Sequence, residues 1–350
     1  MSNAFFNRGG YAGTRHAARD YKLLFSFLPV ILMSVLLRGP ATLVVWALSG
    51  MFSVLLDFLL SVLDRRQYCF SPYSLLLGFF IAAYLPDGVS LYHLFVAIGF
   101  AHVVVLWPFG GRGYAWLNPV AAGVVFIMLA VPSLLSSFSA TLYSQSDTLP
   151  FFLIKQSAAS TPVMASVSFS ASSFDSAISS YLNDSILSSF AAYIPSGYVD
   201  LFLGNVPGPL AAISTAPVIL IGAYLLWDYV VDAVSVISFL AVYACFVWFF
   251  GSFADTGVFA QGDVLFYLFS TDVFFAAFFL LSDPISTPFS MLLSRLWSAF
   301  LGLLAALFSV MGFSPFPALL AIGVGCVFVP LTNYIKTRFV LLQGAKDEEN

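Results

Sequence analysis

Long apolar runs separated by shorter polar segments recur along the whole chain. Most have the length of about 17–22 residues that a helix needs to cross a hydrocarbon layer at ~1.5 Å per residue. They do not alternate in apolar character, as the strands of a membrane barrel would. The sequence therefore predicts an all-α polytopic membrane protein of about ten transmembrane helices. The predicted spans are residues 22–38, 41–62, 72–85, 90–107, 117–136, 209–227, 230–251, 258–281, 291–311 and 315–335.

The order of these runs divides the chain into two membrane halves of five helices each. The halves cover residues 22–136 and 209–335, and the longest polar segment, residues 137–208, lies between them. An N-terminal segment, 1–21, and a tail, 336–350, complete the predicted organisation. The third run is shorter than the others and ends at the turn signal Leu-Pro-Asp-Gly, so a broken or partly re-entrant helix is expected there.

Composition agrees with the membrane assignment and excludes several kinds of site. The 350 residues are 60% hydrophobic and only 9% charged, with 39 phenylalanines, which is more apolar surface than a soluble core needs. The cysteines, Cys69, Cys245 and Cys326, are scattered without Cys-x-x-Cys spacing. This argues against a zinc site, a conventional iron–sulfur site or a disulfide framework. A glycine fingerprint for a dinucleotide is also absent from the sequence.

The distribution of positive charge predicts the orientation in the membrane. If the N-terminus is cytoplasmic, eleven of the 13 lysines and arginines lie on the cytoplasmic side, and only Arg38 and Lys155 lie outside. Such a bias follows the positive-inside rule. Because the number of spans is even, both termini are then cytoplasmic and residues 137–208 are external. The first twenty-odd residues lack the pattern of a cleavable signal, so the first run is expected to remain as a helix.

The external segment contains a hydroxyl-rich stretch, QSAASTPVMASVSFSASSF, at residues 156–174. It holds seven serines and one threonine in an otherwise apolar protein. On composition alone, this stretch is typical of a flexible, water-facing surface loop.

Clusters of polar residues, glycine and proline interrupt the apolar runs, and such backbone in a bilayer must line a cavity or contact protein. Asn118 and the proline after it open a helix whose N-terminal N–H groups either receive an anion or polar ring or form an ordinary helix start. Asp283 either caps the next helix or accepts from the N–H groups of a ligand. The clusters cover residues 107–123, 204–217 and 278–297.

Two carboxylates lie within apolar runs. Burying a carboxylate costs roughly 2.5–3.5 kcal/mol on insertion scales, so Asp272 and Asp57 are candidates for an ion path. Asp57 is near the predicted cytoplasmic end of its helix, where the alternative is that its side chain reaches the interface. His102 is interpreted as a hydrogen-bonded residue of helix packing rather than a ligand.

The order of these clusters resembles one family. The stretches SPYSLLLGFFIAAYLPDG, GGRGYAWLNPVAAG and FFLLSDPISTPFSMLLSRLWSAFLGLLAALF resemble the D subunit of the Rnf ion-translocating electron-transport complex. They are similarly close to the B subunit of the sodium-pumping NADH:quinone oxidoreductase. The resemblance spans most of residues 20–340. The Asn-Pro element of the family matches Asn118 and its proline, and the Ser/Thr-Asp-Pro element matches residues 282–284.

This resemblance implies an FMN joined by a phosphoester bond to an external threonine after the fifth helix. The nearest match to the attachment motif, residues 158–163, places the bond on Thr161, whereas a second register places it on Ser160. The family's Gly and Ala are replaced here by Ala and Ser, and its Asp falls at Lys155. The resemblance also allows a second, noncovalent flavin within the bundle, for which Asn118 and Asp283 are candidate contacts.

The sequence is thus interpreted as a redox subunit of an Rnf-type complex in the cytoplasmic (inner) membrane of a bacterium. The resemblance implies electron transfer between ferredoxin and NAD coupled to Na⁺ or H⁺ translocation, with the FMN as relay at the external face. Other membrane and peripheral subunits and a flavin transferase are the implied partners, and nucleic acid is not. The chain is not expected to be a stand-alone enzyme, and no catalytic or metal-binding residue is assigned.

Two alternatives remain open at this stage. Five plus five helices broken by Pro and Gly also suit a channel or transporter for a small polar solute, with a bundle like that of urea channels. A subunit that assists assembly and has lost its flavin is the other alternative. A covalently attached flavin separates both from the redox subunit.

Overall fold

The structure is a computed structural model. For residues 9–17, 173 and 335–348, only the backbone is described. The residues that it describes are 9–65, 70–86, 89–111, 115–132, 134, 173–185, 188, 194–195, 197–205, 209–253, 259–288, 290–312 and 316–348.

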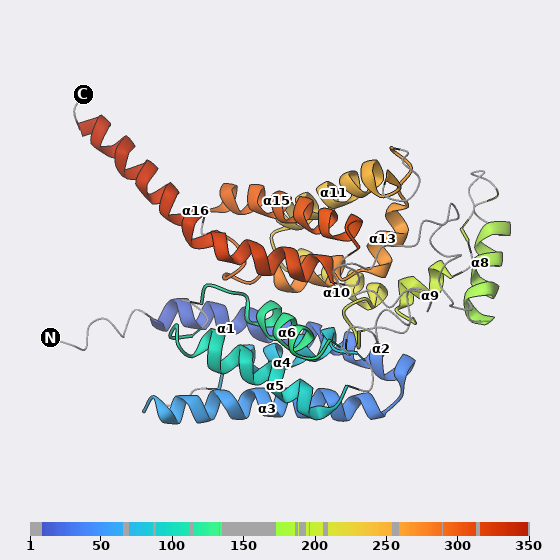
Figure 1. Cartoon of the computed structure of the whole chain (residues 1–350), viewed down its shortest axis with the longest axis horizontal. Coiled ribbons are helices and arrows are strands. Elements are labelled where there is room, and N and C mark those ends of the chain that lie inside the picture. Colours follow the sequence, from blue (N-terminus) through green and yellow to red (C-terminus); the bar gives the residue numbers. More distant parts are fainter. Residues whose placement is uncertain are drawn as a thin grey trace.

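Helices account for all ten predicted spans, which confirms the all-α polytopic class (Figure 1). In the first half the helices are α1 (Gly9–Ser26), α2 (Leu28–Arg38), α3 (Ala41–Leu63), α4 (Pro72–Tyr84), α5 (Leu91–Phe100), the π-helix η2 (Ala101–Leu106) and α6 (Pro119–Ala130). After the first half come α8 (Ser173–Ser185), α9 (Tyr198–Leu203), α10 (Thr215–Trp227), α11 (Ala233–Phe250), α13 (Val264–Ser270), α14 (Val273–Phe275), the π-helix η6 (Ala276–Leu280), α15 (Met291–Val310) and α16 (Pro317–Glu348).

Within the described residues, five segments are long and apolar enough to cross a membrane. They are Ala18–Arg38, Ala41–Leu63, Ala233–Phe250, Met291–Val310 and Pro317–Tyr334. Four shorter apolar helices fall in the third, fourth, fifth and sixth predicted spans. The eighth predicted span is divided into α13, α14 and η6 by a break at Thr271 and Asp272.

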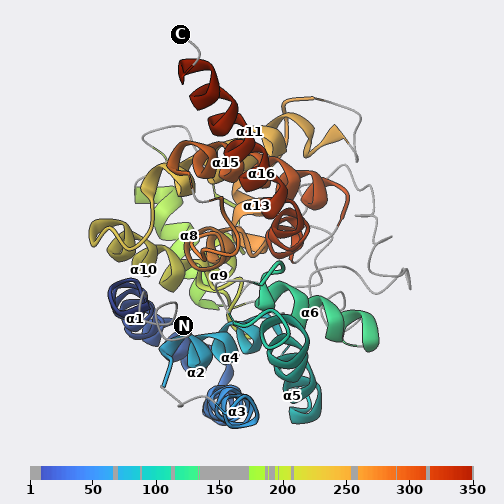
Figure 2. The ribbon, with the colours of Figure 1, turned by 90° about the vertical axis from the view of Figure 1, so that its left-hand side faces the viewer.

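The two halves lie side by side, with the blue-to-green helices on one side and the orange-to-red helices on the other (Figures 1 and 2). The start of α1 and the end of α16 lie at one end of the bundle, here called the termini end, and α8 and α9 lie at the opposite end, the far end (Figure 1). The centre is occupied by α4, eleven of whose 13 residues are buried, and by η6, which is buried throughout.

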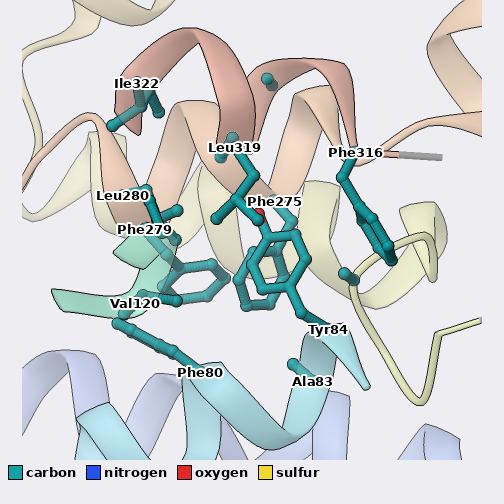
Figure 3. Packing of buried hydrophobic residues seen from close by; sticks show 14 of the residues in the cluster. Phe80, Ala83, Tyr84, Val120, Phe275, Phe279, Leu280, Phe316, Leu319 and Ile322 are labelled. Carbon is teal, nitrogen blue, oxygen red and sulfur yellow. The ribbon is translucent and has the colours of Figure 1, made fainter. Parts of the chain in front are cut away.

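Aromatic rings join the halves at this centre (Figure 3). Tyr84 on α4 meets Phe275 and Phe316 at centroid separations of 5.3 and 5.4 Å, and Phe80 meets Phe275 at 5.8 Å, all edge to face. This is the arrangement that the quadrupoles of aromatic rings favour. Because lipid tails solvate apolar side chains as well as a neighbouring helix does, close packing of this kind has to hold the halves together.

The third span is a short helix, as predicted. α4 ends at Tyr84, and its last carbonyl groups are satisfied by the other half of the chain: Leu210 N–H donates to the Leu85 carbonyl at 2.8 Å, and Ala211 N–H to the Ala83 carbonyl at 3.0 Å. The Arg38 guanidinium donates to the Pro209 carbonyl at 2.7 Å. Non-helical backbone at membrane depth needs such partners, because lipid offers none.

Candidate functional site

The six candidate residues fall into two groups. Thr161 and Ser160 lie outside the described residues. Asn118, Asp283, Asp272 and Asp57 are all described, and they lie at three separate places in the bundle.

Asn118 joins the two polar elements that carry the family resemblance. It begins α6 as predicted: its Oδ1 accepts from the N–H groups of Val120 and Ala121 at 3.0 and 3.2 Å, which is the geometry of an N-cap. Its Nδ2 donates to Ser286 Oγ at 3.0 Å, in the other half of the chain. The N–H groups at this helix start are therefore already satisfied, and a ligand there has to displace Asn118.

Asp283 lies in the turn that follows η6 and is buried. It does not cap the next helix, because α15 begins only at Met291, with Ser290 as its N-cap. Instead, its carboxylate accepts from the Tyr73 hydroxyl on α4 at 3.3 Å and from the Ile285 N–H at 3.4 Å. The polar turn is thus bonded to the start of α4.

Together these contacts form a buried polar cluster at the junction of α4, α6 and α16. Cys326 on α16 is fully buried, and α16 packs against both α6 and η6. Among the described residues there is no group of three or more His, Cys, Asp or Glu side chains that could hold a metal ion. The cluster therefore offers hydrogen-bonding groups, and its observed effect is to bind the two halves to each other.

Asp272 is fully buried at the break between α13 and α14. Its Oδ1 accepts from the Ala318 N–H at 3.0 Å, and its Oδ2 from the Leu319 N–H at 2.8 Å and the Tyr84 hydroxyl at 3.1 Å. Ala318 and Leu319 are the second and third residues of α16. A carboxylate at a helix N-terminus is favoured by the free N–H groups and by the helix dipole.

The starts of α6 and α16 are therefore capped at equivalent positions by different means. Both helices begin with proline, and in both the N–H groups of the second and third residues are taken. α6 uses its own Asn118, whereas the residue before α16 is Phe316, which has no acceptor, and Asp272 of another helix supplies one. The contacts give Asp272 a structural role that sequence reasoning missed, and its role in an ion path stays a prediction.

Asp57 lines a small polar cavity at the termini end, with a volume of about 180 Å³. It accepts from Ser74 Oγ at 2.7 Å. Asp64, seven residues later at the C-cap of the same helix, lines the same cavity and accepts from the Trp107 indole at 3.1 Å. The spacing of seven residues, about two helical turns, puts both carboxylates on one face of α3. This spacing is visible in the sequence and could have indicated that Asp64 lies beside Asp57.

His102 lines this cavity as well and shares a hydrogen bond of 2.8 Å with Ser53. This confirms that it is a hydrogen-bonded residue of helix packing. It is the second residue of η2, whose π-helical turn is closed by the bond from the Trp107 N–H to the His102 carbonyl. Single π-helical turns are frequent at functional sites.

Comparison with known proteins gives this architecture a context. Residues 12–340 match the model of the NQR2, RnfD, RnfE family. The B subunit of the Na(+)-translocating NADH-quinone reductase of Klebsiella pneumoniae (strain 342) is 26% identical over 268 residues, which are 74% of this chain and 59% of that protein. The D subunit of the ion-translocating oxidoreductase complex of Actinobacillus succinogenes is 25% identical over 329 residues, 89% of each chain.

The corresponding B subunit from Neisseria meningitidis serogroup A is 24% identical over 278 residues, 73% of this chain and 59% of that protein. The chain thus spans about three-fifths of the length of the B-subunit relatives that it matches. The family match itself covers nearly the whole chain. The chain therefore belongs to the NQR2, RnfD, RnfE family.

Proposed function

We propose that this chain is the D-type membrane subunit of an Rnf-type ion-translocating oxidoreductase complex. The observation that carries the proposal is the family match over residues 12–340. The D-subunit relative is covered over 89% of its length and the B-subunit relatives over 59%, which favours the D type. Other membrane and peripheral subunits of the complex are then its partners, and the ferredoxin and nicotinamide sites belong to them.

The redox group of the proposal is FMN, attached by a phosphoester bond to Thr161 or, in the alternative register, to Ser160. The Ser-Thr-Pro-apolar sequence at residues 160–163 supports the attachment to Thr161. Bound FMN supplies the electron-carrying chemistry, and the protein supplies position and electrostatics. A flavin transferase is required to make the bond.

The experiment that tests this is expression together with a matching flavin transferase, followed by denaturing electrophoresis under ultraviolet light. A fluorescent band is expected for the unaltered protein, because a phosphoester survives denaturation and a noncovalent flavin does not. Thr161→Ala should abolish the fluorescence and Ser160→Ala should leave it. The reverse pattern moves the bond to Ser160, and a protein that never fluoresces with a competent transferase contradicts the covalent flavin.

A second, noncovalent flavin within the bundle is proposed to contact the cluster of Asn118 and Asp283. The amide and carboxylate of this cluster are the kinds of group that hold the polar edge of a flavin ring. Both are now bonded within the protein, so their hydrogen bonds would be exchanged on binding. Flavin that is extracted by denaturation and is lost in Asn118→Ala supports this site, whereas unchanged extractable flavin in that variant contradicts it.

The ion path is proposed to include Asp57 and Asp272. Asp57 lines a polar cavity of about 180 Å³ at the termini end, where an ion or proton can enter from water. Asp272 is fully buried and accepts from Tyr84, at the other end of α4 from Ser74, which donates to Asp57. The coupling ion is Na⁺ or H⁺, and the vesicle experiment in the Discussion tests Asp272 directly.

The proposed location is the cytoplasmic membrane of a bacterium, with both termini in the cytoplasm and the far end outside. The asymmetry of lysine and arginine supports this orientation. After removal of the native cysteines, a cysteine at Ser173 should react with a membrane-impermeant thiol reagent on intact cells. A cysteine at Asn350 should not react, and the opposite result overturns the orientation.

One observation favours the solute channel as a second candidate function. The two halves begin α6 and α16 in the same way, each with a proline followed by two N–H groups that a side chain caps. Repeated halves and broken helices are typical of secondary transporters. A flavin bound covalently has no use in such a channel, so the fluorescent band separates the two candidates.

A further inference from the structure

A small polar cavity lies between the two halves of the chain, and we call it the seam cavity. It is lined by Arg19 on α1, by the start of α11, by the polar turn after η6 and by the start of α15. Its volume is about 190 Å³, which is below the range of roughly 300–1,000 Å³ that is usual for drug-sized ligands. A cavity of this size suits a small charged group rather than a whole cofactor.

The seam cavity lies where helices enter the membrane. Its lining residues Arg19, Ser235 and Ser294 each fall within the first four residues of a membrane span. The first of these spans enters from the termini end, where α1 begins (Figure 1). The polar headgroups of a bilayer lie at this depth, just outside the hydrocarbon layer.

Arg19 and Asp232 are the charged side chains among the described residues that line the seam cavity. The guanidinium of Arg19 donates to the carbonyl of Ser282, in the other half, and this bond holds it at the cavity. Asp232 accepts from Arg295 at 3.2 and 3.3 Å and from the N–H and hydroxyl of Ser235 at 3.1 and 2.8 Å. Both oxygens of Asp232 are thus engaged, and the three charged side chains, two guanidinium groups and one carboxylate, carry a net charge of +1.

Two hydroxyl groups of the seam cavity are available to a ligand. Within the described part of the chain, the hydroxyls of Thr287 and Ser294 make no hydrogen bond, and neither oxygen is sealed off by protein atoms. A hydroxyl can donate to the oxygen of an anion, and the planar guanidinium of arginine matches the geometry of phosphate. Arg19 with these hydroxyls is therefore a donor set for a phosphate group.

Exposed aromatic side chains stand next to the seam cavity. Trp227 at the end of α10 is 85% exposed and Tyr229 is 93% exposed. The chain continues directly from them to Val230 and Asp232, which line the cavity. Tryptophan and tyrosine are enriched at the membrane–water interface, where their rings sit at the level of the headgroups. α10 lies beside α1 in the bundle (Figure 2), so these rings and Arg19 belong to the same region.

We propose that the seam cavity binds the phosphate group of an anionic phospholipid, with Arg19, Thr287 and Ser294 as its donors. The proposal depends neither on the redox group nor on the coupling ion. Basic pockets between transmembrane helices at a membrane surface are a usual site for anionic headgroups. Because Arg19 belongs to the first half and the two hydroxyls to the second, the bound phosphate joins the halves.

Native mass spectrometry of the purified chain in detergent tests the proposal. Titration with phosphatidylglycerol counts the bound lipids and gives the dissociation constant of the tightest one. Diacylglycerol with the same acyl chains is the control ligand, because it lacks only the phosphate headgroup. We expect one tightly bound phosphatidylglycerol and no comparable binding of diacylglycerol.

Variants of the cavity locate the bound lipid. Arg19→Gln should weaken the binding of phosphatidylglycerol by about tenfold, the usual worth of a charged hydrogen bond. Thr287→Val keeps the shape of the side chain and removes the hydroxyl, so it should weaken binding by about twofold to tenfold. The matched control is Arg38→Gln, because the Arg38 guanidinium also donates to a carbonyl of the other half, that of Pro209, but does not line the cavity.

Each outcome supports or overturns the lipid site. Binding that falls in Arg19→Gln and Thr287→Val but not in Arg38→Gln supports it. Equal binding in all of these proteins, or equal binding of diacylglycerol, overturns it, and Thr287→Val decides alone if Arg19→Gln does not fold. Glycerol phosphate is added as a competitor to separate a lipid from a soluble phosphate. If it displaces phosphatidylglycerol at equal concentration, the cavity belongs to a soluble phosphate and the lipid site is wrong.

Discussion

Replacing Asp272 with alanine removes the carboxylate that holds the start of α16. The N–H groups of Ala318 and Leu319 lose their acceptor, and loss of an N-cap costs ~0.5–2 kcal/mol. The buried Tyr84 hydroxyl loses its acceptor as well, which costs ~1–3 kcal/mol. We therefore expect the free energy of unfolding to fall by about 1.5–5 kcal/mol in total. Reversible unfolding in mixed micelles, followed as the fraction of denaturing detergent rises, measures this change.

A double-mutant cycle identifies the contact responsible. Tyr84→Phe alone should be destabilising, but in the Asp272→Ala background it should cost little, because the hydroxyl is already without its acceptor. Residues in direct contact usually show an interaction free energy of ~0.5–3 kcal/mol. Full stability of Asp272→Ala would refute the capping role, and costs that add without interaction would refute the bond between Tyr84 and Asp272.

Asp272→Asn separates the capping role from the proposed ion path. Asparagine keeps one acceptor oxygen and nearly the same shape, so we expect a smaller loss of stability than with alanine. If Asp272 also carries the coupling ion, this folded variant should lose ion-coupled transport in vesicles while its flavin content stays normal. Full coupling in Asp272→Asn leaves the residue with the structural role alone.

Two further predictions concern the second half. A Cβ added at Gly302 would meet the Phe239 carbonyl oxygen where α11 and α15 cross, so Gly302→Ala should be destabilising. A Cβ added at Gly99 meets nothing within 4 Å, so the control Gly99→Ala in the first half should be neutral or stabilising. Thermal unfolding in detergent compares the two variants. The hydrogen bond from Arg295 is the main cause that holds the pKa of Asp232 below its usual 3.8, so the stability from this pair is present above pH 3.8 and is lost as the pH falls through the lower pKa of the folded protein. Unfolding measured against pH should therefore lose part of its acid dependence in Arg295→Gln, and an unchanged profile would contradict the pairing.

The sequence by itself determined the features that depend on neighbouring residues. A run of apolar residues has to become a helix in lipid, because only a helix satisfies its own backbone there, and the described helices lie in all ten predicted spans. The start of α6 was equally predictable, because Asn118 caps the helix that the next residue, Pro119, begins. The short third span was visible in its length and in the Leu-Pro-Asp-Gly turn.

The break at Thr271 and Asp272 was not predictable in this way. Residues 264–280 contain neither glycine nor proline, and their apolar pattern is that of one continuous helix. The structure breaks the helix there because Asp272 accepts from the start of α16, 46 residues later in the chain. Burying a carboxylate costs free energy wherever it stands in the sequence. Whether an ion, a proton or the N–H groups of a helix start offset that cost depends on which group the fold packs against the carboxylate.

The same reason applies to the cluster of Asn118 and Asp283. Asn118 meets Ser286 across 168 residues of chain, and Tyr73 meets Asp283 across 210. Local sequence determines which backbone groups and side chains need a partner, and only the packing of the two halves decides which partner each of them finds.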